Sequence, residues 1–91
     1  MYLWGEEMKT IKLSKQAEKF LDKQTSKMRD NIIKIIKKIP TNTEFLDIKP
    51  YQGGAADFRL KIGRIRILYD ENGNIIDIIR VGYRGDVYKK R

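Results

Sequence analysis

The chain has 91 residues, with 20 Lys and Arg against 12 Asp and Glu, and its formal net charge is +8. A chain of this length sustains one hydrophobic core, which predicts a single domain. It contains no Cys and no His, which excludes disulfides, Cys/His zinc sites, thiol nucleophiles and imidazole acid–base catalysis. The positive charge favours polyanions or an acidic protein as partners.

The first seven residues, "MYLWGEE", do not join the pattern that follows them. We interpret residues 1–7 as an N-terminal extension and residues 8–91 as the single domain. No stretch of the chain approaches the ~20 apolar residues of a membrane span. Glu6 and Glu7 stand where a signal peptide has a basic and then an apolar run. We therefore expect a cytoplasmic protein without a membrane partner.

The domain is predicted to begin with a strand over residues 8–13 and two amphipathic helices. Ser14 is a candidate N-cap, and apolar residues at helical spacing predict the first helix within residues 15–24. A second apolar stripe repeats over residues 27–39 until Pro40 ends it. The two helices should form a hairpin. The lysines opposite the second stripe are either a solvated face or a contact with RNA; they are Lys34, Lys37 and Lys38.

Three strands are predicted in the second half of the chain, after a connector over residues 40–54. They cover residues 56–62, 64–70 and 75–83, and tight turns join them at Gly63 and at the Asn72–Gly73 pair. The element order β-α-α-β-β-β predicts an α+β fold. We expect an antiparallel sheet with the helical hairpin packed on one face.

The segment "FRLKIGRIRILYD" alternates apolar and basic residues. Strand geometry would turn one set towards the helices, namely Phe58, Leu60, Ile62, Ile65, Ile67 and Tyr69. The other face would then hold four cations, Arg59, Lys61, Arg64 and Arg66. The last strand and the segment after it add Arg80, Arg84, Tyr88, Lys89 and Lys90. Cations that neutralise phosphates beside an aromatic ring that stacks on a base are typical of RNA binding.

The element order, this hairpin and the terminal "VGYRGDVYKK" resemble the RelE/ParE superfamily of bacterial and archaeal toxins over residues 8–91. In the RelE branch the toxin enters the ribosomal A site and cleaves messenger RNA, and a cognate antitoxin inhibits it. The resemblance implies that the 2′-hydroxyl of the RNA attacks the adjacent phosphate without a metal or other cofactor. It also implies the catalytic set Arg59, Lys61, Arg66, Arg84 and Tyr88.

Each member of this set has an expected role. Lys61 and Arg66 would hold the negatively charged transition state, and Arg84 would neutralise or protonate the leaving oxygen. Tyr88 would stack on a base. Arg59 occupies a position where the best-understood relatives carry a lysine proposed as general base, and an arginine keeps its proton. We expect Lys61 to take the proton, assisted by the like charges of its neighbours; Tyr88, or alignment by the ribosome alone, are the alternatives.

Two other functions are compatible with the same fold. A ParE-like inhibitor of DNA gyrase would act through protein contacts and would not need the catalytic set. A non-catalytic RNA-binding or partner-regulating protein would bind without cleaving. For the nuclease we expect a RelB-like or other antitoxin, the ribosome and messenger RNA as partners. Further RNA contacts are expected from Arg64, Arg80, Lys34, Lys37, Lys38, Lys89 and Lys90.

Overall fold

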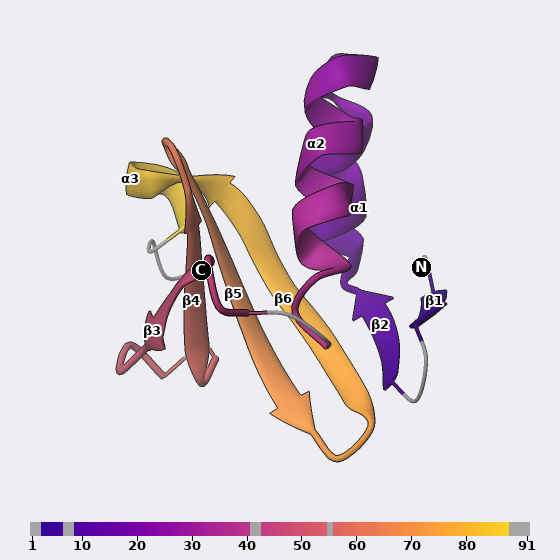
Figure 1. The fold of residues 1–91 in the computed structure, drawn as a ribbon. Helices are drawn as coiled ribbons and strands as arrows, with labels where there is room; N and C mark the ends of the chain where they lie inside the picture. Colours follow the sequence, from indigo (N-terminus) through magenta and orange to yellow (C-terminus); the bar gives the residue numbers. More distant parts are fainter. Residues whose placement is uncertain (1–2, 7–8, 41–42, 55, 88–91) are drawn as a thin grey trace.

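The protein folds into a six-stranded sheet with a helical hairpin on one face (Figure 1). This computed structural model describes residues 3–6, 9–40, 43–54 and 56–87. The strand order across the sheet is β1-β2-β6-β5-β4-β3. The elements are β1 (Leu3–Glu6), β2 (Lys9–Leu13), α1 (Lys15–Asp22), α2 (Ser26–Ile36), β3 (Asp47–Pro50), β4 (Phe58–Ile62), β5 (Ile65–Asn72), β6 (Ile75–Tyr83) and α3 (Arg84–Val87). The predicted α+β fold is confirmed. No helix within the described ranges is long and apolar enough to cross a membrane.

The sheet is mixed, whereas the sequence predicts an antiparallel one. Strands β3, β4, β5 and β6 pair antiparallel, but β2 pairs parallel with β6, with Ile11 opposite Ile76. A parallel pair cannot be joined by a tight turn. The sequence predicts strand directions from tight turns, and no tight turn joins β2 to β6. Strand β6 begins more than sixty residues after β2, so the sequence does not indicate that the two strands pair in parallel.

Two edge strands and a short helix were not expected from the sequence. Strand β1 lies within residues 1–7 and pairs antiparallel with β2, and β3 lies within the predicted connector and pairs with β4. Each has four residues, too few to show an alternating pattern. Strand β3 also contains Pro50, which has no N–H to donate and is tolerated in a sheet chiefly at an edge.

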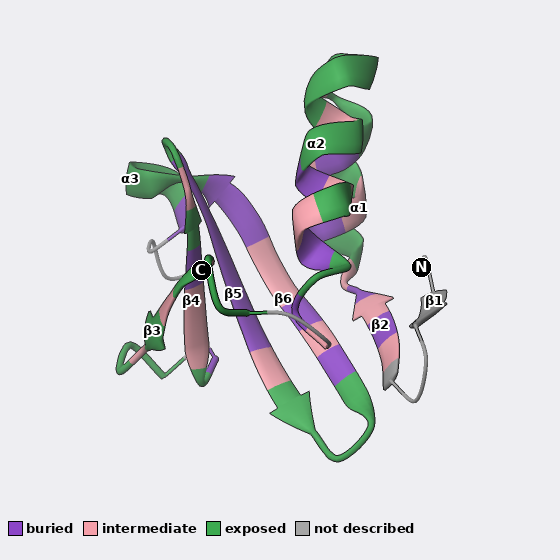
Figure 2. Ribbon diagram, in the orientation of Figure 1, coloured by how far each residue is buried: buried purple, intermediate pink, exposed green. Residues whose placement is uncertain are grey.

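The hydrophobic core lies between the helical hairpin and the sheet (Figure 2). Leu60, Ile65, Ile67 and Tyr69 are buried in it, and Phe58 and Ile62 pack against it half-buried. These six residues are the face predicted to meet the helices, so that prediction is confirmed. Full burial of such an aliphatic side chain contributes about 1.5–3 kcal/mol, so the core residues fix which face of the β4–β5 hairpin turns inward.

Side-chain hydrogen bonds cap the first turn of each helix and hold the two helices together at the turn between them. The Ser14 hydroxyl accepts from the Ala17 N–H (3.1 Å) and caps α1 as predicted, and Thr25 caps α2 by accepting from the Met28 N–H (3.2 Å). Arg29 of α2 donates to the Leu21 carbonyl at the end of α1 (3.0 Å). Helix α2 ends at Ile36, before Pro40, and the chain continues in turns.

A glutamine side chain joins α1 to the sheet where β6 extends beyond its pairing with β2. The Gln16 amide nitrogen donates to the Val81 carbonyl (2.7 Å), and the Gln16 oxygen accepts from the Val81 N–H (2.8 Å). The Ser14 hydroxyl donates to the Ile79 carbonyl two residues earlier (2.7 Å). Together these bonds fix the start of α1 against the part of β6 that leads into α3.

Tyr69 makes the stability of the fold sensitive to alkaline pH. It is 3 % exposed, and its ring stacks on Phe58 with centroids 5.3 Å apart. Burial, and secondarily the charge of Glu71, raises the pKa of Tyr69 from 10.0 to about 12. The folded protein therefore holds this proton more tightly than the unfolded chain does. Its stabilising effect is complete below pH 10 and is lost as the pH rises towards 12.

We expect Tyr69→Phe to flatten this loss of stability. The free energy of unfolding, measured in urea at several pH values from 9 to 12, should fall less steeply for the variant than for the wild type. Tyr83→Phe, which changes a 46 % exposed residue, is the matched control and should follow the wild type. Equal slopes for Tyr69→Phe and the wild type would contradict the assignment.

Candidate functional site

Basic residues stand in register on the sheet face opposite the helical hairpin. Lys61 of β4 pairs with Asp47 of β3 on one side and with Arg66 of β5 on the other. In the next row of this face, Lys49 of β3 pairs with Arg59 of β4. Cross-strand partners project to the same side of a sheet. The pairing therefore gathers charges from three strands on one surface.

These residues line an open hollow of about 340 Å³, which we call the basic hollow; its lining consists of Asp47, Lys49, Arg59, Lys61, Arg66 and Arg84. Five of the six side chains are cations, so the surface attracts an anion such as a phosphate group. The structure thus brings together four of the five residues predicted as the catalytic set. The fifth, Tyr88, lies outside the described residues. Their catalytic roles stay a prediction.

Arg66 is the most constrained of these cations. It is 8 % exposed, and its Nη1 donates to the carbonyl of Gly63 (2.7 Å) and to that of Ile65 (3.2 Å). Gly63 has a φ of 57°, a conformation that glycine adopts without a steric penalty in the turn between β4 and β5. The turn therefore positions the guanidinium before any ligand arrives, and preorganised charge of this kind needs little rearrangement.

Arg59 is held by an acidic neighbour on the edge strand. Its Nη2 lies 3.6 Å from Oδ1 of Asp47, and the two side chains are 16 % and 48 % exposed. An ion pair at this distance that is partly open to water contributes little to stability. Its effect on the site is positional, because it keeps a carboxylate and a guanidinium side by side at the rim of the basic hollow.

Helix α3 contributes Arg84 to the basic hollow, and it follows β6, which β4 and β5 separate from β3. The Arg84 N–H donates to the Arg64 carbonyl (3.1 Å), and Val87 packs against Leu68 and Ala56 in a second, smaller core. The sequence predicts that this face of the sheet is uncovered. The structure corrects this: α3 covers part of it, and Leu68 has no exposed surface. Four helical residues carry no periodicity that could have revealed the cover.

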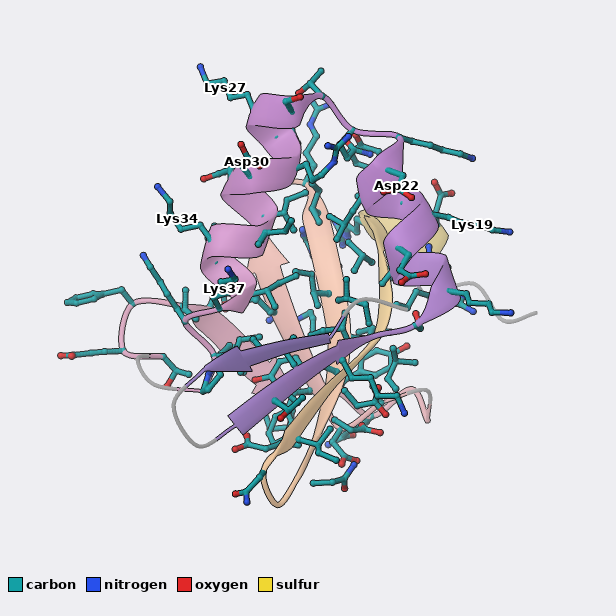
Figure 3. All side chains as sticks on the ribbon, turned by 90° about the vertical axis from the view of Figure 1, so that its right-hand side faces the viewer. Lys19, Asp22, Lys27, Asp30, Lys34 and Lys37 are labelled. Carbon is teal, nitrogen blue, oxygen red and sulfur yellow. The ribbon has the colours of Figure 1, made fainter. Side chains whose placement is uncertain are left out.

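The other predicted RNA contacts that the structure describes do not line the basic hollow. Arg64 is exposed in the β4–β5 turn but does not line the hollow, and Arg80 lines a separate hollow of about 280 Å³ with Phe20 and Tyr83. Lys34 and Lys37 lie on the hairpin side of the molecule (Figure 3), and Lys38 follows them in the chain. Lys89 and Lys90 lie outside the described residues. Of these predicted RNA contacts, Lys34 and Lys37 lie on the hairpin side of the sheet, opposite the basic hollow, whereas Arg64 and Arg80 belong to neither group.

Two residues of the basic hollow were missed in the sequence, Asp47 and Lys49. Both belong to β3, which lies within the segment that the sequence predicts to be a connector. Their spacing of two is the signal that could have placed them on one face, had the strand been recognised. Within the described ranges, no cluster of three or more His, Cys, Asp or Glu side chains could hold a metal ion.

The amino-acid sequence also matches the model of a known protein family. Residues 11–88 match the model of the ParE toxin of type II toxin–antitoxin systems, parDE. Because this match spans most of the chain, the protein belongs to that toxin family. The predicted membership in the RelE/ParE superfamily is confirmed. No curated protein sequence matches the chain.

Solved structures of toxin–antitoxin complexes have the same fold. A chain of the RelB-RelE antitoxin-toxin complex from Methanococcus jannaschii is 28% identical with a TM-score of 0.67, over 85% of this chain and 94% of that one. A chain of the archaeal RelE-RelB complex from Pyrococcus horikoshii OT3 is 23% identical with a TM-score of 0.68, over 87% and 98%. A chain of the RelBE2 toxin-antitoxin complex from Mycobacterium tuberculosis is 20% identical with a TM-score of 0.62, over 81% of this chain and 95% of that one. At their lower identities the last two show the shared fold alone.

The packing of α3 can be tested through Val87, which is 2 % exposed. Val87→Ala removes buried methyl groups, and we expect the free energy of unfolding to fall by about 1–2 kcal/mol in urea titrations. Met28→Ala, at a residue 40 % exposed on α2, is the control and should change it by less than about 0.5 kcal/mol. Equal effects of the two substitutions would show that α3 is not docked on the sheet.

Proposed function

We propose that this toxin is a ribosome-dependent endoribonuclease that cleaves messenger RNA in the A site. The observation that carries the proposal is the convergence of Arg59, Lys61, Arg66 and Arg84 on one hollow. A phosphodiester placed there would be surrounded by cations from two strands and a helix. The similarity to a RelB-RelE complex at 28% identity supports the RelE branch of the superfamily.

The basic hollow suits the charge that develops during this reaction. When the 2′-hydroxyl oxygen attacks the adjacent phosphorus, the non-bridging oxygens gain negative charge. Lys61 and Arg66, paired across β4 and β5, would stabilise that charge, and fixed donors of this kind contribute several kcal/mol to lowering a barrier. Arg84 would stand beside the leaving 5′-oxygen. We assign Tyr88 a stacking role on a base, as the family resemblance implies.

A ParE-like inhibitor of DNA gyrase is the second candidate. The observation in its favour is the family model itself, which is that of the ParE toxin. An inhibitor that acts through protein contacts has no need of a hollow with five cations. We therefore rank it second, ahead of a non-catalytic RNA-binding protein of the same fold.

We further propose that an acidic antitoxin neutralises the toxin. The three similar structures are complexes with antitoxins, and the net charge of +8 favours an acidic segment that covers the hairpin or the basic hollow. The nuclease would act in the cytoplasm, where ribosomes are found. On the ribosome, the hairpin lysines would contact ribosomal RNA; they are Lys34, Lys37 and Lys38.

Translation in vitro tests the nuclease directly. Purified toxin is added to a translating extract, and primer extension maps the ends of the message. We expect cuts within translated codons, and we expect Arg84→Ala to slow cleavage by about 10²-fold or more because it removes charge beside the leaving oxygen. Lys19→Ala, on the outer side of α1 (Figure 3), removes the same charge far from the basic hollow and should cleave like the wild type.

Other outcomes of that experiment point to the other candidates. Intact messages together with loss of supercoiling by gyrase in a parallel assay would indicate the gyrase inhibitor. Ribosome binding without cuts or supercoiling defects would indicate a non-catalytic protein. Equal cleavage by Arg84→Ala and the wild type would contradict the role given to Arg84.

The antitoxin proposal predicts a salt-dependent affinity. The dissociation constant of the toxin–antitoxin complex, measured by calorimetry, should rise as the NaCl concentration increases from 50 mM to 500 mM, because salt screens charge attraction. A double substitution in the basic hollow, Lys49→Gln with Lys61→Gln, should reduce this dependence. An affinity that does not change with salt would contradict the electrostatic part of the proposal.

A further inference from the structure

One carboxylate stands among the cations of the basic hollow. Asp47 is the only acidic residue in the described lining, and the other five residues are Lys or Arg. Its side chain is 48 % exposed and lies 3.6 Å from Arg59. A carboxylate in a phosphate site opposes phosphate binding, so a surface that only bound RNA would gain affinity by losing it. Phosphate binding alone therefore does not explain why Asp47 lies in the hollow, and a role in the reaction would explain it.

The register of the sheet places Asp47 at one end of a row. Asp47 pairs with Lys61, Lys61 pairs with Arg66, and Arg66 pairs with Gly82. Neighbouring strands lie about 4.8 Å apart, so these positions cross the hollow in even steps. Arg84 follows two residues after Gly82, and its N–H donates to the Arg64 carbonyl beside the β4–β5 turn. The row thus runs from the Asp47 carboxylate through the two cations Lys61 and Arg66 to β6, and Arg84, which follows β6, also lines the hollow.

This order matches the demands of an in-line displacement at phosphorus. The attacking oxygen enters opposite the leaving oxygen, so the group that accepts the first proton and the group that stabilises the leaving oxygen must stand on opposite sides of the phosphate. With a phosphate held by Lys61 and Arg66, Asp47 on β3 would be on one side of it and Arg84, which follows β6, would be on the other, because β4 and β5 lie between those two strands.

We propose that Asp47 is the general base of the reaction, an inference that rests on the proposed nuclease function. Its carboxylate takes the proton of the 2′-hydroxyl, and the O2′ atom forms a bond to phosphorus. The bond from phosphorus to O5′ breaks, and O5′ takes a proton from water while Arg84 neutralises its charge. The products are a 2′,3′-cyclic phosphate and a 5′-hydroxyl, and Asp47 returns its proton to solvent.

Arg59 stands where related toxins carry a lysine proposed as general base, and an arginine cannot take that role because it keeps its proton. The Asp47 carboxylate can supply the missing base. Carboxylates are deprotonated at neutral pH, whereas a lysine or an arginine must first lose a proton before it can act as a base. With Asp47 in this role, Lys61 need not serve both as a cation for the phosphate and as a proton acceptor. Arg59 holds the Asp47 side chain beside the hollow through their ion pair.

The test separates the rate of cleavage from binding. Asp47→Asn keeps the shape of the side chain but cannot accept the proton, and we expect the single-turnover rate on programmed ribosomes to fall by about 10²-fold or more. Affinity for the ribosome should be unchanged or higher, because a negative charge has been removed. Asp47→Glu should recover part of the rate. Asp30→Asn, on the outer side of α2 (Figure 3), is the matched control and should behave like the wild type.

The pH dependence of the wild type gives a second, independent measurement that needs no variant. A carboxylate base predicts a single-turnover rate that is level between about pH 6 and 8.5. A lysine base predicts a rate that rises up to tenfold per pH unit across this range. A rising profile would overturn the assignment even if Asp47→Asn failed to fold, which a thermal unfolding scan would show.

The possible failures can be told apart. If the wild type cleaves and Asp47→Asn cleaves within about threefold of it, Asp47 serves only as the ionic partner of Arg59, and the nuclease proposal survives without this base. If the wild type does not cleave translated messages at all, the proposed function fails and the base assignment fails with it. Loss of cleavage with an equal loss of ribosome affinity would also overturn the assignment, since it would indicate a binding role.

Discussion

The arrangement of the basic hollow depends on the register between β4 and β5. Leu60 opposes Ile67 on the core face of this hairpin, and Lys61 opposes Arg66 on the other face. A slip of one residue in either strand would turn its cations into the core and its aliphatic side chains into solvent. Burial of Leu60 and Ile67, neither of which has exposed surface, therefore also sets the positions of the charges behind them. The same β4–β5 pairing thus places the hydrophobic core on one face of the sheet and the basic hollow on the other.

Gathering five cations around one hollow has an energetic cost, because like charges repel each other. The fold limits that cost locally. Arg66 directs its guanidinium at turn carbonyls, and Arg59 has Asp47 beside it. Water reaches the exposed members of the group and screens their repulsion. What remains favours occupation by an anion, so the same charges that weaken the empty site strengthen binding of a phosphate or of an acidic inhibitor.

Much of this could be predicted from the sequence, and the gaps have physical causes. The alternation of Phe58 to Tyr69 revealed both faces of the central hairpin, and Ser14 marked the start of α1, because these signals are local. Strand β3 escaped notice because an edge strand of four residues, exposed or half-buried at every position, shows no alternation. Asp47 and Lys49 belong to this strand, so the sequence does not reveal the acidic residue of the described lining, which only the pairing of β3 with β4 brings to the hollow. The parallel contact of β2 with β6 joins distant segments and leaves no local trace.

The two hydrogen bonds between the Gln16 side chain and the Val81 backbone restrict which amino acids can replace Gln16. Gln16 is exposed on the surface of α1, where almost any polar residue would ordinarily serve. Yet its side chain both donates to and accepts from a single backbone unit. Glutamate lacks the donor, lysine lacks the acceptor, and asparagine is one methylene shorter. A solvent-facing site is thereby restricted almost to one amino acid, a sequence requirement that neither burial nor chemistry at the hollow would have revealed.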